Sequence, residues 1–182
     1  MALPHRYPLI FNPKARSHRG QRALRFLMEK ANHFTLYATN HGDEARELAA
    51  RFAAAGEPVV IAAGGDGTLN AVVCGLAGSK TALAVLPTGT MNVFARELGI
   101  PFDNLAKAFE VIERGFIREI DLFEANHAPF VQLAGVGFDA QVIEEFQRVP
   151  GVFRRDKIHH LQRVHRPQGD VQQITDGNGN DI

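Results

Sequence analysis

The feature that most constrains this chain is the alternation of short apolar segments with helical segments over its first two-thirds. Residues 7–11, 58–63 and 82–86 are nearly continuous apolar runs, and residues 33–38 alternate polar with apolar side chains. Between and after these runs lie segments with helical character, which cover residues 20–30, 43–55, 68–76, 91–98 and 104–114. Strands joined by helices and short loops pair in parallel, and continuous apolar strands are typical of a sheet covered on both faces. The pattern predicts an α/β fold, a three-layer domain built on a parallel sheet.

The last of these helices carries recognisable end signals. Asp103 is the expected N-cap, because a short polar side chain accepts a hydrogen bond from the first free amides of a helix. Leu105, Ala108, Phe109 and Ile112 fall on one face, which predicts an amphipathic helix packed on the core.

The character of the sequence changes after Gly115. Residues 116–125 and 129–136 form two strand-like runs separated by Asn126-His127-Ala128, which predicts a hairpin and hence antiparallel pairing. A short helix is expected over residues 140–147, and no core element is expected after residue 151. We therefore expect three parts. They are a parallel-sheet domain over 1–120, the beginning of an antiparallel β domain over 121–150, and a divergent, poorly ordered tail over 151–182.

Composition excludes several classes of protein. Of 182 residues, 45% are hydrophobic, enough for a real core, and 20 basic residues balance 20 acidic ones, which argues against nucleic acid as a partner. The single Cys74 excludes an internal disulfide and fits a reducing compartment. Because no apolar run is long enough to span a bilayer and the first residues do not resemble a signal peptide, we expect a cytoplasmic protein without a transmembrane segment. The sequence does not indicate an oligomeric state.

The sharpest motif is Gly64-Gly65-Asp66-Gly67-Thr68, directly after one apolar strand and directly before a helix. Glycines let the backbone approach a bound group closely, and the amides at a helix N-terminus favour an anion such as phosphate. A carboxylate beside phosphates calls for a bridging cation, and Mg²⁺ prefers carboxylate and phosphate oxygens. The motif indicates a site for a magnesium nucleotide. The alternative is a tight glycine turn in which Asp66 caps the helix.

Similar loops follow the other strands. They are Asn12-Pro13-Lys14 after the first, Thr39 after the second, and Pro87-Thr88-Gly89-Thr90-Met91-Asn92 after the fourth. The glycines match neither a dinucleotide-binding fingerprint nor a Walker loop. Because the carboxyl ends of parallel strands meet at one edge of a sheet, four such loops predict a nucleotide pocket there.

In order and spacing, these residues resemble the diacylglycerol kinase catalytic domain family over about residues 7–145. That family includes sphingosine and ceramide kinases and the bacterial YegS-type lipid kinases, and it is related in fold to NAD kinases and phosphofructokinases. The matching segments are Asn12-Pro13-Lys14, Thr39, Gly64 to Asn70, Leu86 to Asn92, Phe94-Ala95-Arg96, Glu119-Ile120-Asp121 and Gly135 to Ala140. The glycine motif alone is shared with NAD kinases, and Thr88-Gly89-Thr90-Met91-Asn92 favours the lipid-kinase branch.

The resemblance implies ATP- and Mg²⁺-dependent phosphorylation of a lipid hydroxyl, on diacylglycerol or a related lipid, by an enzyme peripheral to the inner membrane face. The catalytic residues it implies are Asp66, Lys14, Arg96 and Asp121, with Asp66 and Asp121 organising Mg²⁺ through water. The nucleotide-binding residues it implies are Asn12, Thr39, Gly64, Gly65, Asp66, Gly67, Thr68, Asn70, Thr88, Gly89, Thr90 and Asn92.

The sequence departs from the family's pattern at Arg16, where a glycine is frequent, at Ala71, where a glutamate is usual, and at Val93, where many bacterial members have aspartate. It also lacks most of the family's second, β-sandwich domain, so we expect a truncated or frame-shifted reading of a longer gene, or else a short variant with a divergent tail. The alternative function is a nucleotide-binding fragment or pseudokinase without catalytic activity, and a NAD kinase is a further alternative.

Overall fold

The computed structural model of the chain describes residues 6–13, 18–125, 127–132, 134–135, 137–138, 140–142 and 145. Contacts within the chain divide it into two units, Met1–Arg118 and Glu119–Ile182. The domain ranges expected from the sequence stay a prediction, and the tail expected over 151–182 lies outside the described residues.

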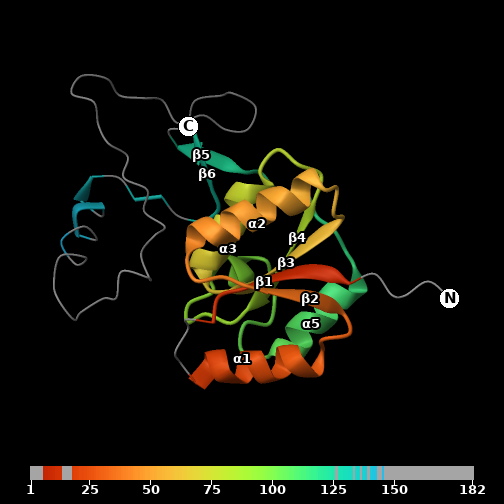
Figure 1. Cartoon of the computed structure of the whole chain (residues 1–182). Coiled ribbons are helices and arrows are strands. Elements are labelled where there is room, and N and C mark those ends of the chain that lie inside the picture. The colour runs from red at the N-terminus through yellow and green to blue at the C-terminus, as the bar shows by residue number, and fades with distance from the viewer. Residues whose placement is uncertain are drawn as a thin grey trace. The chain divides into compact units, whose positions relative to one another are not determined.

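The first unit is built on a four-stranded parallel sheet (Figure 1). Its strands are β1 (Tyr7–Phe11), β2 (Phe34–Ala38), β3 (Val59–Gly64) and β4 (Ala82–Pro87), in the spatial order β2-β1-β3-β4. Every pairing is parallel, as the alternation of strands and helices predicts.

Helices cover both faces of this sheet, which gives the three layers that the sequence predicts (Figure 1). Helices α1 (His18–Glu29) and α5 (Leu105–Arg114) lie on one face, and α2 (Gly42–Ala54) and α3 (Asp66–Leu76) lie on the other. A short helix, α4 (Val93–Glu97), follows β4.

The core under α1 and α5 is aromatic and aliphatic. Leu9, Phe11 and Ile61 of the sheet are buried there in one cluster with Leu27 of α1 and Phe109 of α5. The Phe109 ring packs edge-on against Phe26 and Phe34, with ring centroids 5.9 and 6.3 Å apart. These contacts fix α5 on the sheet, and the predicted apolar face of this helix is confirmed.

Most helix boundaries differ from the sequence-based expectation by one or two residues, and three of these differences are informative. The N-cap of α5 is Asn104, whose Oδ1 accepts a hydrogen bond from Lys107 N at 3.1 Å, so the expected N-cap at Asp103 is wrong. Helix α3 begins at Asp66 instead of Thr68, which places the acidic residue of the glycine motif in the first turn. Helix α4 begins at Val93 instead of Met91, because Asn92 has a left-handed backbone conformation that a right-handed helix does not contain.

The second unit contains an antiparallel pair, β5 (Phe123–Ala125) and β6 (Ala128–Phe130), in which Phe123 lies opposite Phe130. The predicted hairpin is confirmed, but both strands are shorter than expected and Ala128 belongs to a strand instead of the turn. Of the helix expected over residues 140–147, the structure describes 140–142 and 145, and these residues are helical. Among the described residues, no helix has the length and apolar character needed to cross a membrane.

Candidate functional site

Strand register brings the four predicted loops to one edge of the sheet. Phe11 of β1 pairs with Ala38 of β2 and with Ala63 of β3, and Gly64 pairs with Pro87 of β4. The residues that follow these positions therefore lie along one edge, at the carboxyl ends of the strands, where parallel sheets bind ligands.

The loops after β3 and β4 touch through their backbones. Thr88 N donates to Gly64 O at 3.0 Å, and Thr88 is only 4% exposed. A Cβ added at Gly89 would lie 2.3 Å from Gly65 Cα, and one added at Gly65 would lie 3.2 Å from Gly89 Cα. The contact leaves no room for a side chain at Gly89 and little at Gly65, which explains the glycine at each position.

Helix α3 begins in the first of these loops. Its N-cap is Gly65, and the first intrahelical bond runs from Leu69 N to Gly65 O at 3.1 Å. The amides of Asp66, Gly67 and Thr68 precede that bond, in the part of a helix where amides have no helical acceptor. The helix therefore presents amides and the positive end of its dipole at the sheet edge, an arrangement that favours an anion.

The carboxylate of Asp66 reaches across to the other loop. Its Oδ1 accepts a hydrogen bond from Val93 N, the first amide of α4, at 2.7 Å. No side chain caps α3, so the alternative in which Asp66 caps its own helix is wrong. The Asp66 side chain instead accepts a hydrogen bond from a residue 27 positions later in the sequence.

The turn that leads into α4 is closed by Asn92. This residue has φ 49° and ψ 50° and is 3% exposed. Its Oδ1 accepts from Gly89 N at 3.1 Å, and its Nδ2 donates to Gly89 O at 3.0 Å. Both ends of the Asn92 amide are thus engaged within the loop that the sequence assigns to the nucleotide.

Arg96 is held by the same segment. Its Nε donates to Met91 O at 2.8 Å, and its guanidinium carbon lies 3.6 Å from the centre of the Phe102 ring. Within the described residues Arg96 and Asp66 form no ion pair, although both bond to the segment from Met91 to Val93. The structure thus brings the two predicted catalytic residues to one loop without direct contact between them.

A shallow hollow that is partly open to solvent lies among β3, β4, α3 and α4. The residues that line it are Ala62, Gly64, Gly65, Asp66, Leu69, Val85, Pro87, Asn92 and Ala95. Apart from Asp66 and Asn92, the residues of this wall are apolar or glycine.

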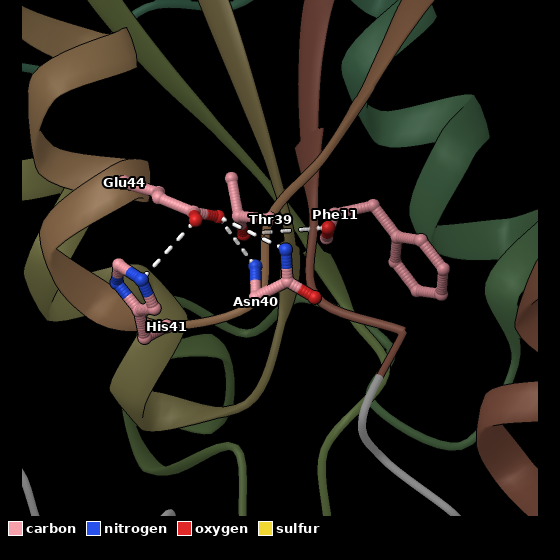
Figure 2. Close-up of polar contacts among 5 residues, drawn as sticks. All are labelled: Phe11, Thr39, Asn40, His41 and Glu44. Carbon is pink, nitrogen blue, oxygen red and sulfur yellow. Dashed lines mark hydrogen bonds and ion pairs between the residues drawn. The ribbon is translucent and has the colours of Figure 1, made fainter.

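Thr39 directly follows β2 at the same sheet edge (Figure 2). It is 1% exposed, and its N and Oγ1 donate to Phe11 O at 2.8 and 3.4 Å. These bonds tie the end of β2 to the end of β1.

Glu44 was not singled out from the sequence, yet it organises the loop that follows Thr39. Figure 2 shows its carboxylate between Asn40 and His41: Oε2 accepts from Asn40 N at 2.6 Å, and Oε1 lies 3.1 Å from His41 Nε2. A Cβ at Gly42 would lie 3.6 Å from Ala71 Cβ, so the start of α2 adjoins α3. The residue at the N-cap is His41 instead of Ser or Thr, and Glu44 bonds the residue before it, so no capping motif in the sequence indicated this role.

The remaining predicted site residues are placed as follows. Asn70 donates from Nδ2 to Cys74 Sγ at 3.9 Å, and burial raises the pKa of the Cys74 thiol, opposed by the nearby charge of Arg46. Thr90 is exposed. Asp121 is exposed in the second unit, and Lys14 lies outside the described residues. Among the residues that the structure describes, no three or more His, Cys, Asp or Glu side chains gather to hold a metal ion.

Comparison with known proteins identifies a family. The model of the "diacylglycerol kinase catalytic domain" matches residues 6–125. The chain is 38% identical over 137 residues to a diacylglycerol kinase of Bacillus subtilis, and 37% identical over 143 residues to one of Staphylococcus saprophyticus. These alignments cover 71% and 75% of this chain, and 45% and 47% of the two relatives.

Solved structures agree with this result. A crystal structure of a diacylglycerol kinase from Bacillus anthracis superimposes with a TM-score of 0.61 at 30% identity, over 69% of this chain and 49% of that one. The chain therefore spans less than half the length of these relatives. With a match over about two-thirds of its residues, the chain belongs to the diacylglycerol kinase catalytic domain family.

Proposed function

We propose that this chain binds Mg-ATP at the carboxyl edge of its parallel sheet. The observation that carries the proposal is the junction of two loops there. The free amides at the start of α3 lie beside the glycine contact between Gly65 and Gly89, and Asp66 stands between the loops. Amides favour the phosphates, and the glycines let the backbone approach them.

The residues at this junction fit a magnesium ion bound together with phosphates. Asp66 engages Oδ1 with Val93 N, and the described residues provide no further partner for Oδ2. Mg²⁺ keeps several waters and is commonly held by one or two carboxylates plus substrate phosphates, so a single carboxylate suits it. Bound Mg²⁺ supplies charge neutralisation to the phosphates. The chain's own residues, Gly64 to Thr68 and Thr88 to Met91, supply the cradle, with Asn12, Thr39 and Asn70 around it.

We further propose that the enzyme transfers the γ-phosphate of ATP to a hydroxyl of diacylglycerol or a related lipid at a membrane surface. Membership of the family supports the kinase class. Phosphoryl transfer depends chiefly on positioning and on stabilising charge, which suits Asp66 and Arg96 held on one loop. Lys14 and Asp121 stay predicted catalytic residues.

The test is an assay of the purified chain with Mg-ATP and vesicles that contain diacylglycerol. We expect phosphatidic acid to form in the wild type and to fall to background in Asp66→Ala, because that variant loses both the carboxylate charge and the acceptor for Val93 N. Asp103→Ala is the matched control, since Asp103 is exposed and does not cap α5.

A second candidate is nucleotide binding without transfer, since every contact cited for the nucleotide lies within the unit Met1–Arg118. Binding of Mg-ATP without any phosphatidic acid would support it. A chain that binds no Mg-ATP would contradict both candidates.

A further inference from the structure

The side chain of Asn92 is buried and forms its hydrogen bonds within its own loop. It is 3% exposed, and both ends of its amide bond the backbone of Gly89. These two bonds close the turn from Gly89 to Asn92. Asparagine is one of the few residues with a side chain that tolerates the left-handed conformation found here.

That conformation has a consequence for the next residue. Val93 is the first residue of α4, where the amide has no acceptor within the helix. The turn at Asn92 aims this amide at Asp66, and Val93 N donates to Asp66 Oδ1 at 2.7 Å. One oxygen of the carboxylate is thereby fixed, and with it the orientation of the other.

We propose that Asn92 is a positioning residue that orients the Asp66 carboxylate through the Val93 amide and does not itself hold the nucleotide. The proposal rests on the proposed function in one respect, namely that Asp66 faces the magnesium of Mg-ATP. A carboxylate near a cation works only when its own partners hold it in place, because misplacement of the group weakens the site.

Two substitutions separate positioning from direct binding. Asn92→Gly and Asn92→Ala both remove the side-chain amide, but glycine adopts the left-handed conformation freely whereas alanine does not. If Asn92 positions Asp66 through the backbone, Asn92→Gly keeps Mg-ATP affinity within about threefold of wild type and Asn92→Ala weakens it about tenfold. If Asn92 contacts the nucleotide directly, Asn92→Gly loses at least about tenfold in Mg-ATP affinity although the Val93–Asp66 hydrogen bond is kept, which would overturn the proposal.

Hydrogen exchange at Val93 gives a readout that needs no nucleotide. In the full wild-type chain we expect the Val93 amide to be protected, because Asp66 accepts its hydrogen bond. Protection should persist in Asn92→Gly and be lost in Asn92→Ala and in Asp66→Ala. Asn104→Ala, which removes the N-cap of α5, is the control for loss of an asparagine side chain and should leave Val93 protected.

The two readouts also separate the two proposals. A wild-type chain with this exchange pattern but no affinity for Mg-ATP would contradict the proposed function and support the orientation of Asp66 by Asn92. Rapid exchange of Val93 in the wild type would contradict the role of Asn92, whatever the affinity for Mg-ATP. Circular dichroism of each variant identifies any that fails to fold, and Asn92→Gly then decides the outcome alone, since loss of Val93 protection in a folded Asn92→Gly contradicts the proposal.

Discussion

At the scale of single residues, the candidate site depends on backbone atoms that side chains would push apart. Gly65 and Gly89 touch at the junction of the two loops. The same junction holds the carboxylate of Asp66 through the amide of Val93. A single methyl group at the contact therefore acts on both loops at once.

The two glycines make a matched pair of substitutions. In Gly89→Ala the new Cβ would lie 2.3 Å from Gly65 Cα and 2.8 Å from Asn92 Oδ1, so the backbone must shift. In Gly65→Ala the Cβ would lie 3.2 Å from Gly89 Cα, a strain that a small adjustment relieves. We expect Gly89→Ala to lower the free energy of unfolding by about 1–3 kcal/mol, as overpacking does, and Gly65→Ala to lower it by less. Urea unfolding measures both, and an equal or reversed order would contradict this geometry.

At the scale of elements, the site is made by helix beginnings that stand on strand ends. The N-terminus of α3 follows β3, and that of α4 follows β4. The start of α2 follows β2 and adjoins α3 at Gly42 and Ala71. The loop between β2 and α2 is therefore part of the same edge, and Glu44 determines its conformation through Asn40 and His41 (Figure 2).

Glu44 provides the prediction at this scale. Glu44→Ala removes the acceptor for Asn40 N and should lower the free energy of unfolding by about 1 kcal/mol, as the loss of a helix cap does. Glu44→Gln keeps an amide oxygen as acceptor and should recover about half of that loss. His41→Ala is the control, because an exposed ion pair contributes only about 0–1 kcal/mol. Thermal unfolding measures all three variants. If His41→Ala lowers the free energy of unfolding as much as Glu44→Ala does, the hydrogen bond from Asn40 N to Glu44 does not hold the loop.

The elements were largely predictable, because they depend on local patterns. The apolar runs of β1 and β3 are buried over most of their length and that of β4 over its second half, so each strand is visible as a continuous run. Caps were less certain, since Asp103 and Asn104 are adjacent and both are good N-caps, and only the structure shows that Asn104 bonds Lys107. The helix start at Asp66 was also displaced by two residues, because glycines give no helical signal.

The contacts that organise the site were not predictable in this way. The bond from Val93 to Asp66 joins residues 27 positions apart, and no local pattern reports it. The two hydrogen bonds between the Asn92 side chain and the Gly89 backbone likewise depend on the left-handed backbone at Asn92. The sequence shows that both residues are present but does not indicate that conformation. The sequence indicated which loops meet, whereas the structure shows which atoms bond.

At the scale of the whole molecule, membership of the family rests on residues 6–125, which include all four strands of the parallel sheet. The predicted family and fold class are both confirmed. Kinase activity on a lipid remains a proposal, because the relatives are about twice as long as the matched region. The central claim is thus that the first unit alone presents a magnesium-nucleotide site with Asp66 at its centre.

Calorimetric titration of the chain with Mg-ATP tests that claim most directly, comparing wild type with Asp66→Asn. Asparagine retains an oxygen that accepts from Val93 N, so the loop geometry is kept and only the charge is removed. We expect Asp66→Asn to weaken Mg-ATP binding at least about tenfold, as the loss of one charged contact does, and Asp103→Asn, an equal change of charge on the surface, to leave it unchanged. Equal affinity of the wild type and Asp66→Asn for Mg-ATP would contradict the claim.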